Sequence, residues 1–132
     1  MRSHYVLALG AAVGAMLMLA FSSLRAAPAR PAPAYVIAEV EVTDPKVFQE
    51  YAAQVPATIR SAGGHYLVRG GPTVSLEGAA PKRIVVIGFD SASQAQAWYA
   101  SPAYVAIRGI RQRSAHTRAF IIEGVAPNGE AK

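Results

Sequence analysis

Residues 84–89 read Ile-Val-Val-Ile-Gly-Phe, and this short apolar run decides the fold. Its length suits a β-strand, and turn-forming residues precede it. Since Ile84, Val85, Val86 and Ile87 follow one another without a polar residue, both faces of such a strand are apolar. A strand of this kind is typical of the centre of a sheet, with one face against helices and the other against a second layer. We therefore predict a central strand here.

The chain before this strand predicts another strand and a long helix. Apolar side chains alternate with Ile37, Glu39 and Glu41 over residues 36–42, which is the period of a strand. Asp44 can then cap a helix that takes Pro45 into its first turn and ends at the glycines after residue 62. Because an interior proline removes a hydrogen bond, we expect Pro56 to kink or break this helix.

Residues 65–69 predict a brief second strand, which Gly70-Gly71-Pro72 closes as a turn. We expect residues 73–76 to continue this strand after a bulge.

The last third of the chain predicts two helices and a final strand. Ser91 and Gln94 have the spacing of a capping box and open one helix. Ser101 followed by Pro102 repeats the cap-plus-proline start of a second, short helix. Alternation over residues 117–123 then predicts the last strand, so the predicted order of strands and helices is βαββαβ.

This order predicts an α+β ferredoxin-like sandwich, in which two helical segments cover one face of a four-stranded sheet. The other face would be bare, yet the strand at 84–89 is apolar on both sides. A second copy of the same sheet is the simplest cover for that face. We therefore predict a homodimer of a domain that spans residues 35–125.

Several short motifs in this domain resemble a known family. They are GGHYLVRGG at 63–71, LEG at 76–78, RIVVIGFDS at 83–91, WYASPAY at 98–104 and EG at 123–124. Together they resemble the family catalogued as domain of unknown function DUF1330. The resemblance implies a dimeric α/β barrel of two ferredoxin-like protomers, and it implies no catalytic residue. It also implies that a shared mechanism would not depend on His65, whose position is variable in the family pattern.

The N-terminal segment is of a different kind. Arg2 precedes an uncharged, mostly apolar run over residues 5–24, and small residues follow it. Residues 1–26 therefore predict a signal peptide or, because the run approaches the length of a bilayer, an N-terminal membrane anchor. Residues 27–34 predict a stiff Pro/Ala-rich linker, and residues 126–132 a flexible tail. Both alternatives predict that the domain lies in the periplasm or outside the cell. We expect any contact with the membrane to be made by this N-terminal segment alone.

Composition excludes several kinds of site. The chain has no cysteine, which removes disulfides, thiolate zinc sites and cysteine nucleophiles. The formal net charge is +5, but no aromatic residues are interleaved among the clustered arginines 108, 111, 113 and 118, so we predict no nucleic-acid binding. Neither His65 nor His116 has a second ligand at a suitable spacing, so we predict no metal and no cofactor.

Five residues are the candidates for a ligand-binding site: Arg69, His65, Trp98, Tyr104 and Arg111. Simple alternation places His65, Leu67 and Arg69 on one side of a strand, where a base beside a cation could bind an acid. We expect Arg69 to be the principal polar residue, since its guanidinium can hold a carboxylate with two hydrogen bonds. An ion pair between Arg69 and Glu39, Glu77 or Glu123 is the structural alternative.

Trp98, Tyr99 and Tyr104 could form an aromatic wall for a ligand, or they could pack as ordinary core. Three functions stay open: an exported or tethered module that binds a small organic or anionic ligand, a cofactor-independent oxygenase or isomerase, and a purely structural dimer. The first is the leading hypothesis, and no catalytic residue is assigned.

The N-terminal segment generates the first testable prediction. We expect the full-length chain to leave the cytoplasm, because residues 5–24 are apolar and follow a basic residue. Cell fractionation with an intact-mass measurement tests this and separates a cleaved signal from a retained anchor. Soluble full-length protein in the cytosol would contradict it.

Overall fold

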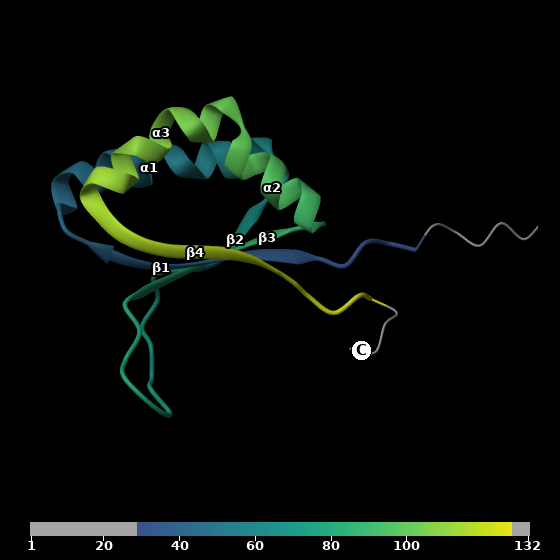
Figure 1. Cartoon of the computed structure of the whole chain (residues 1–132), viewed down its shortest axis with the longest axis horizontal. Helices are drawn as coiled ribbons and strands as arrows, with labels where there is room; N and C mark the ends of the chain where they lie inside the picture. Colours follow the sequence, from purple (N-terminus) through teal and green to yellow (C-terminus); the bar gives the residue numbers. More distant parts are fainter. Residues whose placement is uncertain (1–28, 128–132) are drawn as a thin grey trace, which may run out of the picture.

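The structure is a computed structural model that describes residues 29–127 (Figure 1). The elements are β1 (Ala34–Val42), α1 (Pro45–Ser61), β2 (His65–Arg69), β3 (Arg83–Phe89), α2 (Ala92–Ala100), α3 (Pro102–Ser114) and β4 (Ala115–Glu123). The predicted segment at 1–26 lies outside the described residues, as do the first residues of the predicted linker and most of the predicted tail. Within the part of the chain that is described, no helix has the length and apolarity needed to cross a bilayer.

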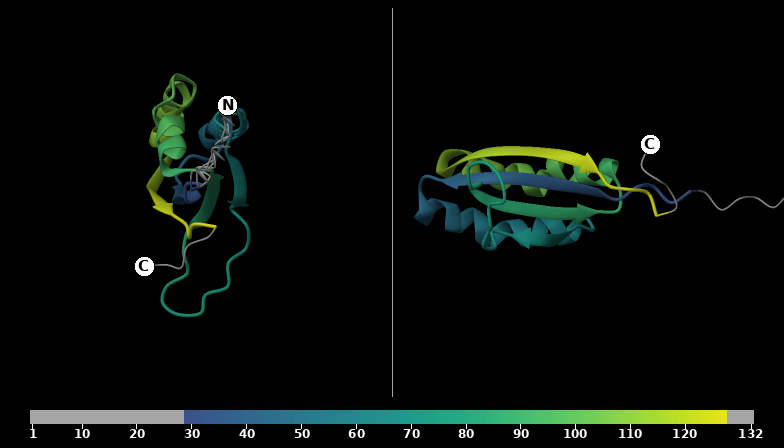
Figure 2. Two further views of the ribbon diagram at one scale, coloured as in Figure 1. Left: turned by 90° about the vertical axis from the view of Figure 1, so that its right-hand side faces the viewer. Right: turned by 90° about the horizontal axis from the view of Figure 1, so that it is seen from below.

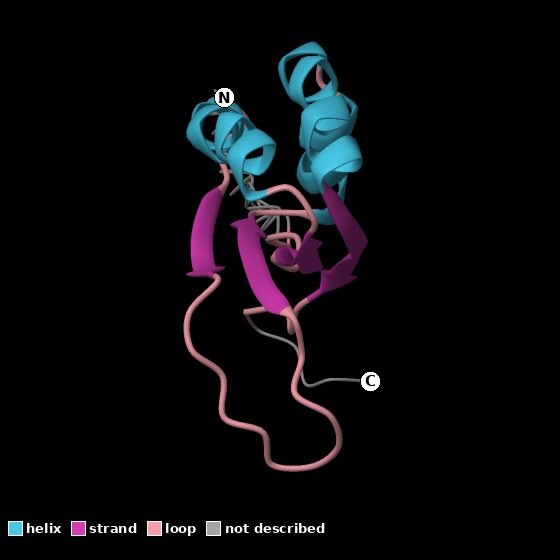
Figure 3. Cartoon of the chain, turned by 90° about the vertical axis from the view of Figure 1, so that its left-hand side faces the viewer, coloured by secondary structure: helices cyan, strands magenta, loops and turns pink. Residues whose placement is uncertain are grey.

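The four strands form one sheet in the order β2-β3-β1-β4, and every neighbouring pair is antiparallel. All three helices lie on the same side of this sheet, as Figures 1 and 3 show. The predicted α+β ferredoxin-like fold is therefore confirmed, with the strand at 83–89 in the interior of the sheet.

The sheet has two unlike faces because side chains alternate along each strand. Val36 and Val40 of β1 and Ile87 of β3 are buried beneath the helices. The opposite face carries a row of apolar side chains across all four strands, in which direct partners are Val68, Val86, Ile37 and Phe120. No helix of the described chain covers this second face, and Phe120 is 44% exposed there. We call it the bare face (Figure 2).

The helix starts follow the sequence rules. Asp44 caps α1 by accepting a hydrogen bond from the Val47 amide at 3.1 Å. The Ser91 hydroxyl accepts from the Gln94 amide at 3.2 Å, and the Ser101 hydroxyl accepts from the Tyr104 amide at 3.3 Å. Each of these bonds satisfies an amide that the first helical turn leaves free. The predicted starts of all three helices are confirmed.

Two local expectations need correction. Of the kink or break expected at Pro56, the break is absent, because the first helix runs without interruption from Pro45 to Ser61. Residues 73–76 do not extend β2, because the chain from 71 to 82 is an exposed loop. This loop, which we call the arm, projects away from the helices on the side of the bare face (Figures 1 and 3), with Leu76 92% exposed.

Candidate functional site

A cavity of about 60 Å³ lies between the sheet and the helices. Aliphatic side chains of β1 and β3 form its floor, and aromatic side chains of α1, α2 and α3 form much of its wall. Its polar members are Tyr51, Tyr66, Arg69, Arg83, Tyr99, Tyr104, Arg111 and Thr117. On the scale at which one water needs roughly 10–15 Å³, the cavity has room for about four to six waters or a small polar group.

The wall is built from aromatic rings in contact. The Trp98 and Tyr104 rings have their centroids 4.2 Å apart, and the two hydroxyls of Tyr51 and Tyr104 lie 3.2 Å apart. The Trp98 indole N–H donates to the Thr58 hydroxyl at 3.1 Å, which ties α2 to α1. These contacts hold the phenol oxygens at one place in the wall. Trp98 and Tyr104, both candidates from the sequence, thus line the cavity and also belong to the core.

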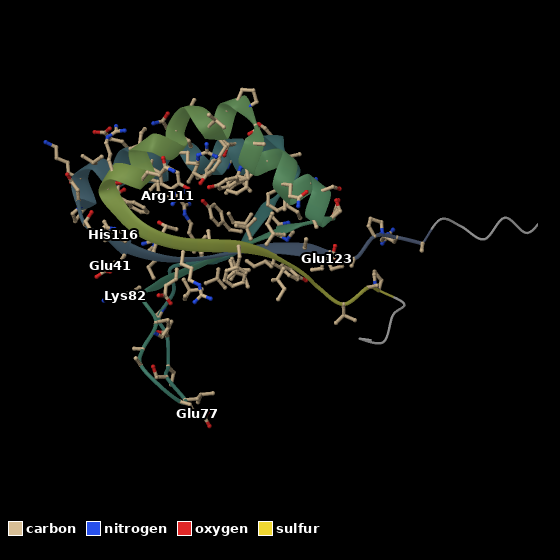
Figure 4. All side chains as sticks on the ribbon, viewed as in Figure 1. Glu41, Glu77, Lys82, Arg111, His116 and Glu123 are labelled. Carbon is tan, nitrogen blue, oxygen red and sulfur yellow. The ribbon has the colours of Figure 1, made fainter. Side chains whose placement is uncertain are left out.

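Arg111 is the most deeply buried charged group of the cavity. It lies in the last turn of α3 with only 8% of its surface exposed, and it points into the space between that helix and the sheet (Figure 4). Within residues 29–127 the one ion pair joins Lys82 to Glu41 at 3.3 Å, outside the cavity. Arg111 therefore has no carboxylate partner in the described chain. Its polar neighbours are the phenols of Tyr104 and Tyr51.

The Tyr51 phenol beside Arg111 stays protonated. Burial raises the pKa of Tyr51 far above its ordinary value, and the neighbouring Tyr104 raises it further, more than Arg111 lowers it. Burial likewise raises the pKa of Tyr66. These hydroxyls are therefore hydrogen-bond donors throughout the physiological pH range and cannot serve as bases there.

Arg69 lies at the rim of the cavity because β2 contains a bulge. Leu67 has no partner in β3, so the register shifts by one residue between Tyr66 and Val68. This shift turns Arg69 to the helix side, where its guanidinium carbon lies 4.8 Å from the Tyr66 ring centroid. The Nη2 group of Arg69 donates to the Ala52 carbonyl at 3.0 Å.

That carbonyl is available because of Pro56. In an α-helix the Ala52 carbonyl would accept from the amide four residues later, and a proline has none. Arg69 supplies the missing hydrogen bond. The ion-pair alternative for Arg69 is wrong, since the salt bridge between Lys82 and Glu41 is the only one that the described residues form.

His65 is not part of the cavity. It pairs with Gly88 ahead of the bulge, and its ring lies 3.0 Å from where a Cβ on Gly88 would be. The alternation predicted His65 and Arg69 on one face, and this prediction is wrong because the bulge at Leu67 separates them. The structure thus brings Arg69, Trp98, Tyr104 and Arg111 together around one cavity and leaves His65 on the bare face.

Four polar residues of the cavity were not found by sequence reasoning: Tyr51, Tyr66, Arg83 and Thr117. Tyr51 and Tyr66 lie within the predicted first helix and second strand, and Arg83 opens the motif at 83–91, but none of them was predicted as a site residue. Thr117 was treated as the start of a strand, yet its hydroxyl oxygen is buried without a hydrogen-bond partner in the described chain. Strand alternation could have identified Thr117. It lies two residues before Ala119 in β4, so both side chains are on the cavity side of the sheet. No group of three or more metal-ligating side chains occurs among residues 29–127.

A comparison with family models matches residues 33–125 to domain of unknown function DUF1330. The chain belongs to this family. The match covers the whole sheet and all three helices, so the resemblance seen in the sequence is confirmed. No curated protein sequence is similar enough to count as a relative.

Two solved structures share the fold of this DUF1330 domain. One is a protein of unknown function from Rhodopseudomonas palustris, with a TM-score of 0.60 and 16% identity over 76% of this chain and 88% of that one. The other is SnoaB, a cofactor-independent oxygenase from Streptomyces nogalater, with a TM-score of 0.52 and 13% identity over 75% of this chain and 99% of that one. Similarity at this level shows the shared fold.

The bond between Arg69 and Ala52 generates the second prediction. Replacing Arg69 by Met should lower the free energy of unfolding by about 1–2 kcal/mol, from one lost hydrogen bond and one cation–π contact. In a Pro56→Ala background the new amide at position 56 can satisfy the Ala52 carbonyl. The decrease in the free energy of unfolding caused by Arg69→Met should then be smaller by about 1 kcal/mol, which is the coupling expected of groups in direct contact.

Urea unfolding of the two single variants and the double variant measures this coupling. Arg60→Met, on the exposed side of α1, is the control and should cost the same in both backgrounds. Strictly additive effects of Arg69→Met and Pro56→Ala would show that the proline and the arginine act independently.

Proposed function

We propose that this DUF1330 domain binds a small organic anion in the cavity, with Arg111 holding the negative group. The observation that carries the proposal is the burial of Arg111 without a carboxylate partner among residues 29–127. A buried cation normally has an anion or several hydrogen-bond acceptors beside it, because desolvation of the charge is costly. A bound anion would supply that partner.

The other polar groups of the cavity suit such a ligand. Tyr51 offers a protonated hydroxyl near the guanidinium, and the Tyr104 hydroxyl lies 3.2 Å from it. Thr117 offers a buried hydroxyl without a partner in the described chain. Arg69 and Arg83 add positive charge at the lining, while no Asp or Glu of the described chain lines it. A concave, largely apolar cavity with a few convergent polar groups of one sign is a typical small-molecule site.

The same geometry favours binding over proton-transfer catalysis. An oxygenase or isomerase that acts through an enolate needs a base for the first proton, and His65 lies on the bare face. Neither a carboxylate nor an imidazole of the described residues lines the cavity, and the Tyr51 phenol is too weak an acid to act as its anion. Because SnoaB, a cofactor-independent oxygenase, has the same fold, an enzymatic function is kept as the second hypothesis. The purely structural alternative predicts a filled core rather than a polar cavity.

Substitution of Arg111 tests the proposal. Arg111→Met keeps an unbranched apolar stem and removes the guanidinium with its charge, so carboxylate binding should be lost. The free energy of unfolding should stay the same or rise by up to about 2 kcal/mol, because a buried unpaired charge is replaced by an apolar chain. Arg113→Met, an exposed arginine in the same helical turn, is the matched control and should keep wild-type binding.

Calorimetric titration with acetate, propanoate and benzoate measures the binding, and the corresponding amides provide uncharged controls. Urea unfolding gives the stability of each variant. If the carboxylates bind neither the wild-type protein nor Arg113→Met, or if Arg111→Met binds them normally, the anion-binding proposal is wrong. A marked loss of stability in Arg111→Met with unchanged binding would make Arg111 a structural residue.

We further propose that the domain forms a homodimer through the bare face. The row from Val68 to Phe120 crosses all four strands, and Ile122 beside it is 48% exposed. The arm adds Val74 and Leu76, which are 87% and 92% exposed on the same side of the sheet. Apolar surface of this extent on one face of a soluble domain is typical of an interface.

Matched substitutions test the dimer. Phe120→Glu places a charge at the β4 end of the apolar row and should convert a dimer to a monomer in light scattering. Val105→Glu, on the outer surface of α3 with nearly the same exposure, should leave the dimer intact: Val105 is 45% exposed and Phe120 is 44% exposed. A monomeric wild-type protein at micromolar concentration would contradict the proposal.

The proposed place of action is outside the cytoplasm, as an exported or membrane-tethered domain. The support for this is the apolar run at 5–24 and the proline-containing residues after it.

A further inference from the structure

A second hollow of about 270 Å³ lies beside the edge strand β4. It is lined by Val36, Tyr99, Ala119, Phe120 and Ile121, of which Phe120 also lies in the apolar row of the bare face. Three of these residues, Val36, Tyr99 and Ala119, also line the cavity that contains Arg111. The two hollows therefore adjoin along one shared wall, and we call the second one the outer groove.

The two spaces differ in size and chemistry. The inner cavity has a volume of about 60 Å³ and contains the polar groups Arg111, Tyr51 and Thr117. The outer groove is more than four times larger, and its lining has no charged side chain. Its one polar side-chain group is the Tyr99 phenol. A ligand that fills both spaces thus has a small anionic head and a larger apolar body.

We propose that the anion bound by this domain is an amphipathic carboxylate, whose head lies at Arg111 and whose alkyl or aryl-alkyl chain lies in the outer groove. This inference rests on the proposed anion-binding function and specifies its ligand. Charge complementarity selects the head, because the inner cavity is lined by arginines and by no Asp or Glu of the described chain. Burial of the ligand's apolar part in the outer groove removes apolar surface from water, which favours binding.

In this proposal, the alkyl or aryl-alkyl part of the ligand leaves the inner cavity beside β4. β4 is an edge strand, and residues 29–127 place no further strand beyond it. Ala119, at the shared wall, has the smallest side chain among the residues of the outer groove, and it is exposed. Tyr99 on α2 faces the same wall and is 39% exposed. In the proposal, the apolar part of the ligand passes between Ala119 and the Tyr99 ring, since both residues line both hollows.

Calorimetric titration with a series of straight-chain carboxylates tests the inference. The protein is expressed from the full-length sequence and used in the form that the cell produces. Acetate, butanoate, hexanoate and octanoate extend the chain in steps, and the matched primary alcohols lack the charge. Each methylene that enters the groove should tighten binding by about fourfold. The gain should stop once the chain is longer than the groove.

Substitution at the shared wall locates the effect. Ala119→Phe should narrow the space beside the Tyr99 ring and bring the ratio of the acetate to the octanoate dissociation constant close to one. Ala106→Phe, on the exposed surface of α3, is the control and should keep the wild-type ratio. If thermal unfolding shows that Ala119→Phe does not fold, Tyr99→Ser tests the opposite wall and should reduce the ratio as well.

The outcomes separate the two proposals. Carboxylates that bind with equal affinity at every chain length would overturn the amphipathic ligand and leave anion binding at Arg111 standing. Alcohols that bind as well as the acids, or carboxylates that do not bind at all, would overturn both. An unchanged chain-length ratio in a folded Ala119→Phe variant would overturn the place assigned to the chain.

Discussion

Contacts between aromatic rings hold the helices at a distance from the sheet, and the cavity depends on that distance. The rings of Phe48, Tyr51, Tyr104 and Trp98 form a continuous row, with centroid separations of 5.6, 6.4 and 4.2 Å between successive members. Aromatic side chains are large and rigid, so such a row cannot collapse into the space beneath it. The hydrogen bond from Trp98 to Thr58 fixes one end of the row to α1.

The space kept open in this way has an unusual electrostatic character. Arg69, Arg83 and Arg111 all contribute to it, and the described acidic side chains lie elsewhere. Interactions between charges are strongest where water is excluded, so the buried guanidinium of Arg111 sets the sign of the field in the cavity. Burial of the guanidinium has a desolvation cost, which the neighbouring phenols of Tyr104 and Tyr51 offset. The cavity contains an arginine rather than an apolar residue in spite of this desolvation cost. Its presence is consistent with a role for the charge in binding.

Local rules predicted the elements well, because they depend on residues close together in the chain. Alternation identified β1, and the caps at Asp44, Ser91 and Ser101 identified the helix starts. The site was predicted less well. Trp98, Tyr104 and Arg111 line the cavity. Helical spacing places Arg111 on the same face of α3 as Tyr104, but its depth depends on the packing of α3 against the sheet.

Two errors of the local rules are linked by one tertiary contact. Alternation failed at Leu67, where one extra residue in β2 moves every later side chain to the other face. The proline rule failed at Pro56, where the expected break is absent. These two departures compensate each other: the bulge turns Arg69 toward α1, and Arg69 donates the hydrogen bond that Pro56 cannot. Each residue is unfavourable within its own element, and the pair is satisfied only when β2 packs beside α1. The rim of the cavity is therefore set by a tertiary contact between two local irregularities, and reasoning about one element at a time cannot find it.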